Sequence, residues 1–165
     1  MEADLWERRK EINVWSCGTL NELGRPLGQT VLGMLTWDIH RLIDYIELRS
    51  DCGAGGIGCA GLSGGGLQTV WAAALDQRIR CAVVSGFIRG VKDLYVKGGL
   101  GCSCSYAPGL HENFDTGDIG ALIAPRPLLV ETGDRDELNG ASGLDNVYSQ
   151  VEIMRRAYRL LDAEE

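Results

Sequence analysis

The chain has 165 residues, a length typical of one domain with its own hydrophobic core. Its formal net charge is -7 and no basic run is longer than Arg8–Lys10, which argues against nucleic acid as a partner. No stretch approaches the roughly 18 apolar residues of a membrane span, and the N-terminus lacks an apolar signal core. We therefore expect a cytoplasmic protein that does not engage a membrane.

The six cysteines raise the question of disulfides or a metal site. Cys59 and Cys81 lie in predicted core strands, where cysteine behaves as a small apolar residue, so we expect reduced thiols. Cys102 and Cys104 are separated by one serine, but no second cysteine pair or histidine cluster accompanies them in the sequence, as a zinc site would require. We interpret them as loop cysteines and expect neither a metal nor a cofactor.

The first third of the chain predicts a connecting segment and one long helix. Residues 1–27 show no sustained period, and a short helix over Asp4–Ile12 is the element expected there. From about Thr30 to Ile46 the apolar residues follow a 3.6-residue period, which predicts a helix with one buried face. His40 falls within this helix, where we expect a packed or surface side chain rather than a catalyst.

The residues that follow change from a strand pattern to a helix pattern. Ile57–Leu62 is short, apolar and uncharged, as expected of a strand buried on both faces, and helical spacing follows from residue 64. Gly61–Gly65 fits the G-x-S-x-G pattern of a sharp strand-to-helix turn, in which side chains at positions 61 and 65 would collide. The pattern predicts that Ser63 is a nucleophile and that the Gly64 N–H, at the positive end of the helix, stabilises an oxyanion.

The rest of the chain alternates strands and helices, which predicts a parallel sheet with right-handed crossovers. Residues 86–114 are irregular and are expected to form either a cap over a site or an ordinary surface loop. The predicted strands are Cys81–Ser85 and Leu128–Glu131, and the predicted helices are Asp115–Ile123 and about Asn146–Leu161.

Two carboxylates follow the last predicted strand. Asp134 and Asp136 lie in a tight turn at the same edge of the sheet as Ser63, because the carboxyl ends of parallel strands meet at one edge. A carboxylate there can orient the histidine of a catalytic triad, although surface turns are also rich in aspartate. The turn alone leaves both aspartates, and a purely structural role, open.

Six motifs span nearly the whole chain: Glu7–Arg9, Trp37–Asp38, Ile57–Gly66, Ala82–Gly86, Cys104–Leu110 and Asp118–Leu129. With them the sequence resembles the dienelactone hydrolase and acetyl xylan esterase-like branch of the α/β-hydrolases. The last motif, which ends in Ala-Pro-Arg-Pro-Leu-Leu, is the most specific. The resemblance implies an α/β fold: a three-layer α/β/α arrangement with a mostly parallel sheet, in a single partial domain over residues 1–165. It also implies Ser63 as nucleophile, Gly64 as oxyanion donor and Asp136 as acid, with Asp134 as the neighbouring alternative.

The chain departs from this family at the histidine. The family places its catalytic histidine some tens of residues beyond the acid, but no histidine follows Asp136. His111 precedes the acid, in a loop that the family does not use for catalysis. The chain also begins about where the family's fourth strand ends, so we expect an internal piece of the domain, truncated at both ends.

These observations predict a serine hydrolase that acts on a small-molecule carboxylic ester through an acyl-enzyme. Without its histidine the chain should be nearly inactive, since losing a triad member costs on the order of 10⁴-fold or more. One alternative is a truncated or degenerate hydrolase-like protein that serves as a non-catalytic binding or association module and forms homo-oligomers through uncovered sheet edges. Another is hydrolysis of a thioester, peptide or lactone on the same fold.

Overall fold

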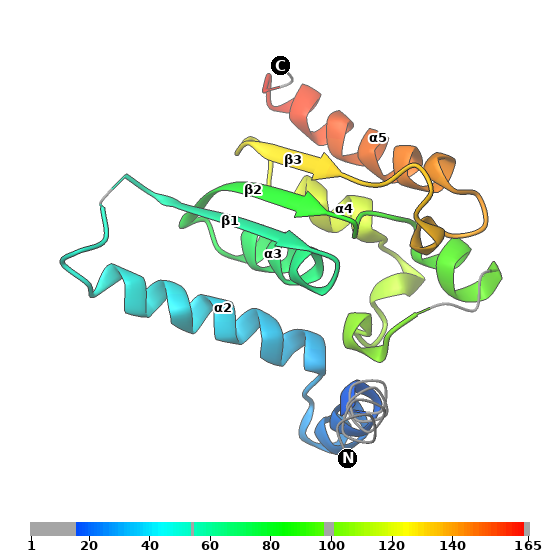
Figure 1. The fold of residues 1–165 in the computed structure, drawn as a ribbon, viewed down its shortest axis with the longest axis horizontal. Coiled ribbons are helices and arrows are strands. Elements are labelled where there is room, and N and C mark those ends of the chain that lie inside the picture. The colour runs from blue at the N-terminus through cyan, green and yellow to red at the C-terminus, as the bar shows by residue number, and fades with distance from the viewer. Residues whose placement is uncertain (1–15, 54, 98–100, 164–165) are drawn as a thin grey trace, which may run out of the picture.

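The structure is a computed structural model that describes residues 16–53, 55–97 and 101–163, and these residues form an α/β fold (Figure 1). The strands of the described residues make one sheet in the order β1-β2-β3, in which both neighbouring pairs are parallel. They are β1 (Ile57–Leu62), β2 (Ile79–Ser85) and β3 (Leu128–Glu131). The predicted parallel α/β sheet is confirmed.

The helices fall where the hydrophobic periodicity placed them. They are α2 (Val31–Glu47), α3 (Gly64–Leu75), α4 (Thr116–Ala121) and α5 (Leu144–Leu160). Thr30 caps α2 by accepting a hydrogen bond from the Gly33 N–H at 3.0 Å, and Asp115 and Asp118 form a capping box on α4. Residues 16–24 are also helical, which was not predicted, whereas the helix expected over Asp4–Ile12 lies outside the described residues. No helix of the described residues is both long and apolar enough to cross a membrane.

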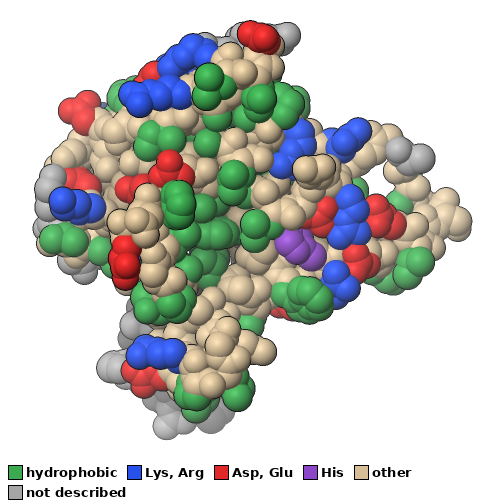
Figure 2. Space-filling view, turned by 180° about the vertical axis from the view of Figure 1, so that it is seen from behind, with side chains coloured by type: hydrophobic (Ala, Val, Ile, Leu, Met, Phe, Trp, Pro, Cys, Tyr) green, Lys and Arg blue, Asp and Glu red, His purple; other side chains and the backbone are tan. Residues whose placement is uncertain are grey.

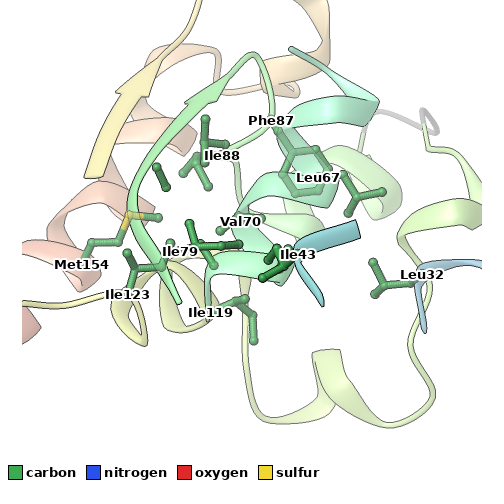
Figure 3. Close-up of a cluster of buried hydrophobic side chains, with 14 residues drawn as sticks. Leu32, Ile43, Leu67, Val70, Ile79, Phe87, Ile88, Ile119, Ile123 and Met154 are labelled. Carbon is green, nitrogen blue, oxygen red and sulfur yellow. The ribbon is translucent and has the colours of Figure 1, made fainter. Parts of the chain in front are cut away.

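The hydrophobic core lies on one face of the sheet. Burial alternates along β1 and β3. The half-buried side chains of these strands pack against one cluster of buried residues from β2, α2, α3, α4 and α5 (Figure 3). On the other face Leu62 is 70% exposed and Leu129 is 53% exposed. The prediction that β1 is buried on both faces was therefore wrong for the described residues, because their helices pack on one face only. Seen from the side opposite to Figure 1, hydrophobic side chains gather toward the middle of the molecule, with charges of both signs around them (Figure 2).

Arg126, in the Ala-Pro-Arg-Pro segment, links three parts of the chain. Its guanidinium donates to the carbonyl oxygens of Ala73 and Ile79, each at 2.6 Å, and to that of Asp76 at 3.0 Å. These carbonyls belong to the last turn of α3, to the loop that follows it and to the start of β2. The Arg126 side chain thus links the residues just before β3 to the connection between α3 and β2 by hydrogen bonds.

Candidate active site

Ser63 occupies the turn between β1 and α3. Its φ of 55° and ψ of -113° lie in a region that residues other than glycine rarely adopt, and its side chain is exposed. The Ser63 N–H donates to the Ser85 carbonyl at 2.9 Å, and its own carbonyl accepts from the Leu67 N–H at 2.9 Å. The turn is therefore bonded to the end of β2 and to the first turn of α3, with the hydroxyl at the carboxyl end of the sheet.

The glycines of the turn have separate steric roles. A Cβ on Gly61 would lie 2.2 Å from the Gly65 carbonyl oxygen, and one on Gly66 would lie 2.7 Å from the Ser85 carbonyl oxygen and 2.9 Å from the Phe87 Cβ. A Cβ on Gly65 would meet no heavy atom within 4 Å. The expected collision at position 61 is confirmed and that at position 65 was wrong, because the backbone of Gly65, and not a side chain there, is what approaches Gly61.

Gly64 is the first residue of α3. The first N–H groups of a helix have no carbonyl partner within the helix and carry partial positive charge. The Gly64 N–H is therefore available beside the Ser63 hydroxyl, and its role as an oxyanion donor stays a prediction.

Asp136 lies close to the serine turn, and Gly86 separates the two. A Cβ built on Gly86, whose φ is +61°, would lie 3.9 Å from Asp136 Oδ2 and equally 3.9 Å from the Ser63 nitrogen. The other carboxylate oxygen of Asp136 accepts from the Leu138 N–H at 2.9 Å, which orients the side chain. Asp134 is exposed and forms no hydrogen bond or ion pair with the described residues. Ser63 and Asp136 therefore both lie next to Gly86.

Two buried asparagines hold the turn that carries Asp136 in place. Asn139, which is 2% exposed, donates to the Gly133 carbonyl at 2.8 Å and accepts from the Thr132 hydroxyl at 2.9 Å. Asn146 in α5 donates to the Asn139 carbonyl at 2.8 Å, and its side chain forms a two-way pair with the backbone of Gly90. The turn that carries Asp136 is therefore bonded both to α5 and to the segment that follows β2.

Arg89 is a charged neighbour of this site that sequence reasoning missed. Its guanidinium donates to the Gly86 carbonyl at 3.1 Å and lies 5.2 Å from the centre of the Phe87 ring. Burial lowers the pKa of Arg89, and the negative charge of Asp136 acts in the opposite direction. The signal in the sequence was a cation just past the end of β2, at the edge where Ser63 and Asp136 also lie.

Neither histidine of the chain contacts Ser63. His40 Nε2 lies 3.4 Å from the Ala72 carbonyl, near the end of α3. Ser63 precedes the opposite end of that helix, roughly 14 Å from Ala72 at 1.5 Å per residue. His111 Nδ1 lies 3.2 Å from the Phe114 carbonyl of its own loop. Neither imidazole therefore lies between Ser63 and Asp136.

The structure adds a third thiol to the cysteine pair of the 86–114 region. Cys102 and Cys104 have a third thiol beside them, because Cys17 from the helix at residues 16–24 places its sulfur within 4.8 Å of both. Burial is the main cause that raises the pKa of Cys104 to about 12. Burial acts in the same sense on Cys102, but hydrogen bonds from Cys104 and Cys17 prevail and lower its pKa. Cys17 is far from Cys102 and Cys104 in the sequence, so the spacing of the cysteines could not reveal the cluster.

A concavity of about 790 Å³ lies at the opposite end of the sheet. It is lined by Ile57 at the start of β1 and by Arg78 and Arg80 near the start of β2. Arg78 is occupied there by ion pairs with Asp44 and Asp76. Neither Ser63 nor Asp136 lines this cavity.

The chain is similar to hydrolases and esterases. It is 34% identical over 129 residues to the protein named "Putative hydrolase YtaP" of Bacillus subtilis (strain 168), a match that covers 75% of this chain and 42% of that protein. In structure it is similar to a glucuronoyl esterase from Solibacter usitatus, with 21% identity and a TM-score of 0.60 over 77% of this chain and 36% of that one. No protein-family model matches the chain.

A second solved structure gives a longer match. It is described as a "putative acetyl xylan esterase" from Bacteroides fragilis NCTC 9343, with 20% identity and a TM-score of 0.67 over 89% of this chain and 36% of that one. The chain spans less than half the length of each of these proteins. This partial coverage fits the expected fragment of a larger domain. Its parallel sheet, its helices and these likenesses together show that the chain has a partial α/β-hydrolase-like fold, as its motifs led us to expect.

Proposed function

We propose that this chain carries the nucleophile and the acid of a serine hydrolase that acts on small-molecule carboxylic esters. The observation that carries the proposal is the position of Ser63, an exposed serine in a strained turn beside the glycine that Asp136 also flanks. A hydroxyl held in this way attacks a carbonyl carbon once a base takes its proton. The likeness to proteins named as hydrolases and esterases supports an ester as the class of substrate.

Each residue has a defined role in this reaction. Ser63 Oγ forms a bond to the carbonyl carbon, and the oxygen that becomes negative accepts a hydrogen bond from the Gly64 N–H. The tetrahedral intermediate expels the alcohol and leaves an acyl-enzyme, which water then hydrolyses. Asp136 orients the imidazole that takes and returns the proton. A thioester or lactone would undergo the same attack. Residues 86–97 and 101–114, which lie beyond the carboxyl end of β2, would cap the substrate (Figure 1).

The base of this site comes from outside the chain. His40 and His111 are both engaged with backbone carbonyls of α3 and of the 111–114 loop, away from Ser63. Free imidazole is therefore a useful probe, because a small base that diffuses to Ser63 can perform the proton transfer that the chain lacks.

The experiment that tests the proposal is labelling with a fluorophosphonate, with and without added imidazole. We expect slow labelling of the purified chain, acceleration by imidazole, and mass-spectrometric assignment of the label to Ser63. Ser63→Ala should abolish the labelling. Ser50→Ala is the matched control, because Ser50 is also exposed but lies in the turn after α2, and it should label like the wild type.

The outcome that contradicts the proposal is a folded chain that does not label at Ser63 even with imidazole. That result would favour the second candidate function, a non-catalytic association module. The observation behind this alternative is that neither histidine contacts Ser63 while one face of the sheet is open. Circular dichroism of the same samples separates an inert site from an unfolded chain.

A further inference from the structure

Three cysteine thiols converge from two segments of the chain. The sulfur atoms of Cys17, Cys102 and Cys104 all lie within 4.8 Å of one another, and all three thiols are free. Cys17 lies in the helix at residues 16–24, whereas Cys102 caps the short helix Ser103–Ser105 that contains Cys104. The Cys104 N–H points at Cys102 Sγ at 3.5 Å, an arrangement that stabilises negative charge on sulfur.

A buried side chain holds the two segments together. Asn21 is 5% exposed, and its Nδ2 donates to the Ser103 carbonyl, between the two cysteines of the short helix. Its Oδ1 accepts from the Val31 N–H at 2.8 Å, at the start of α2. A buried carboxamide with both ends satisfied fixes the position of both backbones. The cluster is therefore built into the packing of the helix against the loop.

We propose that Cys17, Cys102 and Cys104 bind a thiophilic divalent cation, with Zn²⁺ as the preferred ion. Zn–S bonds of about 2.3 Å place the sulfurs of a tetrahedral site about 3.8 Å apart. The three sulfurs need to approach one another by no more than about 1 Å to reach that spacing, which side-chain rotation can supply. Three thiolates and one solvent oxygen complete the coordination, and soft sulfur donors select such ions over Mg²⁺ or Ca²⁺.

The convergence of three thiols favours a metal over a disulfide. A disulfide would use two of the sulfurs and leave the third beside it as a free thiol, whereas a cation uses all three. The bound ion would fasten the helix at residues 16–24 to the 86–114 segment, near Arg89, whose charge interacts with Cys104. This role is structural and does not depend on whether Ser63 is a nucleophile.

The test is a titration of the metal-free, reduced 165-residue chain with Co²⁺, followed by displacement with Zn²⁺. We expect one equivalent of Co²⁺ to produce the charge-transfer absorption of thiolate bound to a tetrahedral ion, and one equivalent of Zn²⁺ to remove it. Cys17→Ser, Cys102→Ser and Cys104→Ser should each weaken binding by at least about 100-fold, since changes outside the ligand shell alone cost roughly 10–100-fold.

Matched controls come from the other exposed cysteines. Cys52→Ser and Cys81→Ser should bind Co²⁺ like the wild type, because both thiols are exposed and lie outside the cluster. A second measurement needs no substitution. Zn²⁺ should slow the alkylation of residues 17, 102 and 104 by iodoacetamide, read by mass spectrometry, and leave Cys52 and Cys81 as reactive as before. This protection experiment tests zinc binding even if Cys104→Ser fails to fold.

Three results would overturn the proposal. One is the absence of thiolate absorption on adding Co²⁺ to the folded, reduced chain. Another is equal protection of Cys52 and Cys81 by Zn²⁺. The third is a Cys17–Cys102 disulfide that forms on removal of reductant in a chain that binds neither ion, which would assign the cluster to redox chemistry.

Discussion

At the scale of single residues, alanine substitutions at two glycines of the serine turn should have different effects on the free energy of unfolding. We expect Gly61→Ala to lower the free energy of unfolding by about 3 kcal/mol or more, because its Cβ would meet backbone atoms of Gly65 that cannot move aside. Gly65→Ala should be neutral or stabilising by up to about 1 kcal/mol, because its Cβ meets open space in a helix. Urea unfolding of both variants measures the difference, and equal losses would show that the turn is looser than described.

Local sequence patterns revealed Ser63 but not the roles of Arg89 and Cys17. The G-x-S-x-G pattern locates Ser63 because a strained turn leaves a local trace, namely glycines at fixed offsets. Arg89 and Cys17 leave no such trace. Arg89 matters because the sheet brings it to Asp136, and Cys17 because packing brings it to Cys104, residues far away in the sequence. Contacts of this kind depend on the complete fold, which no local pattern contains.

At the scale of elements, Arg126 joins α3, β2 and the start of β3. Arg126→Met should lower the free energy of unfolding by about 3 kcal/mol, since it leaves the carbonyls of Ala73 and Ile79 without their charged donor. Arg126→Lys should recover less than half of this, because one ammonium cannot reproduce the planar fork of donors. Urea unfolding measures both variants. Arg135→Met, at an exposed arginine, is the control, and a loss as large there would refute the assignment.

The elements themselves could be predicted to different degrees. The period of α2 extends over many residues, so one face was evident, and the strand β3 was found at its observed bounds, Leu128–Glu131. The helix at residues 16–24 was missed because its apolar residues are few and two of its leucines, Leu20 and Leu23, are exposed. The burial of β1 was overestimated because its outward residues, such as Gly58 and Ala60, are small and carry no polar signal.

At the scale of the whole molecule, the open sheet face, defined by Ala60, Leu62 and Leu129, predicts self-association. We expect the chain to form oligomers as its concentration rises. Leu129→Lys should weaken this association about tenfold or more. A leucine buried in the interface contributes about 1.5–3 kcal/mol, and burying the lysine ammonium there would oppose the contact. Sedimentation velocity over a concentration series measures it. Leu160→Lys, at a leucine of α5 that is 85% exposed, is the control. A monomer at every concentration, or equal effects of both substitutions, would refute this use of the face.

The strands lie in the sheet in the same order as they occur in the chain, so the ribosome makes them in the order in which they pair. The serine turn is bonded to Ser85 and closed sterically by Phe87, so everything that shapes it has left the ribosome before β3 is made. The aspartate arrives only later, when Gly86 donates to Glu131 and the third strand docks. A nascent chain that stalls between these two events would carry a correctly bent serine with no acid beside it.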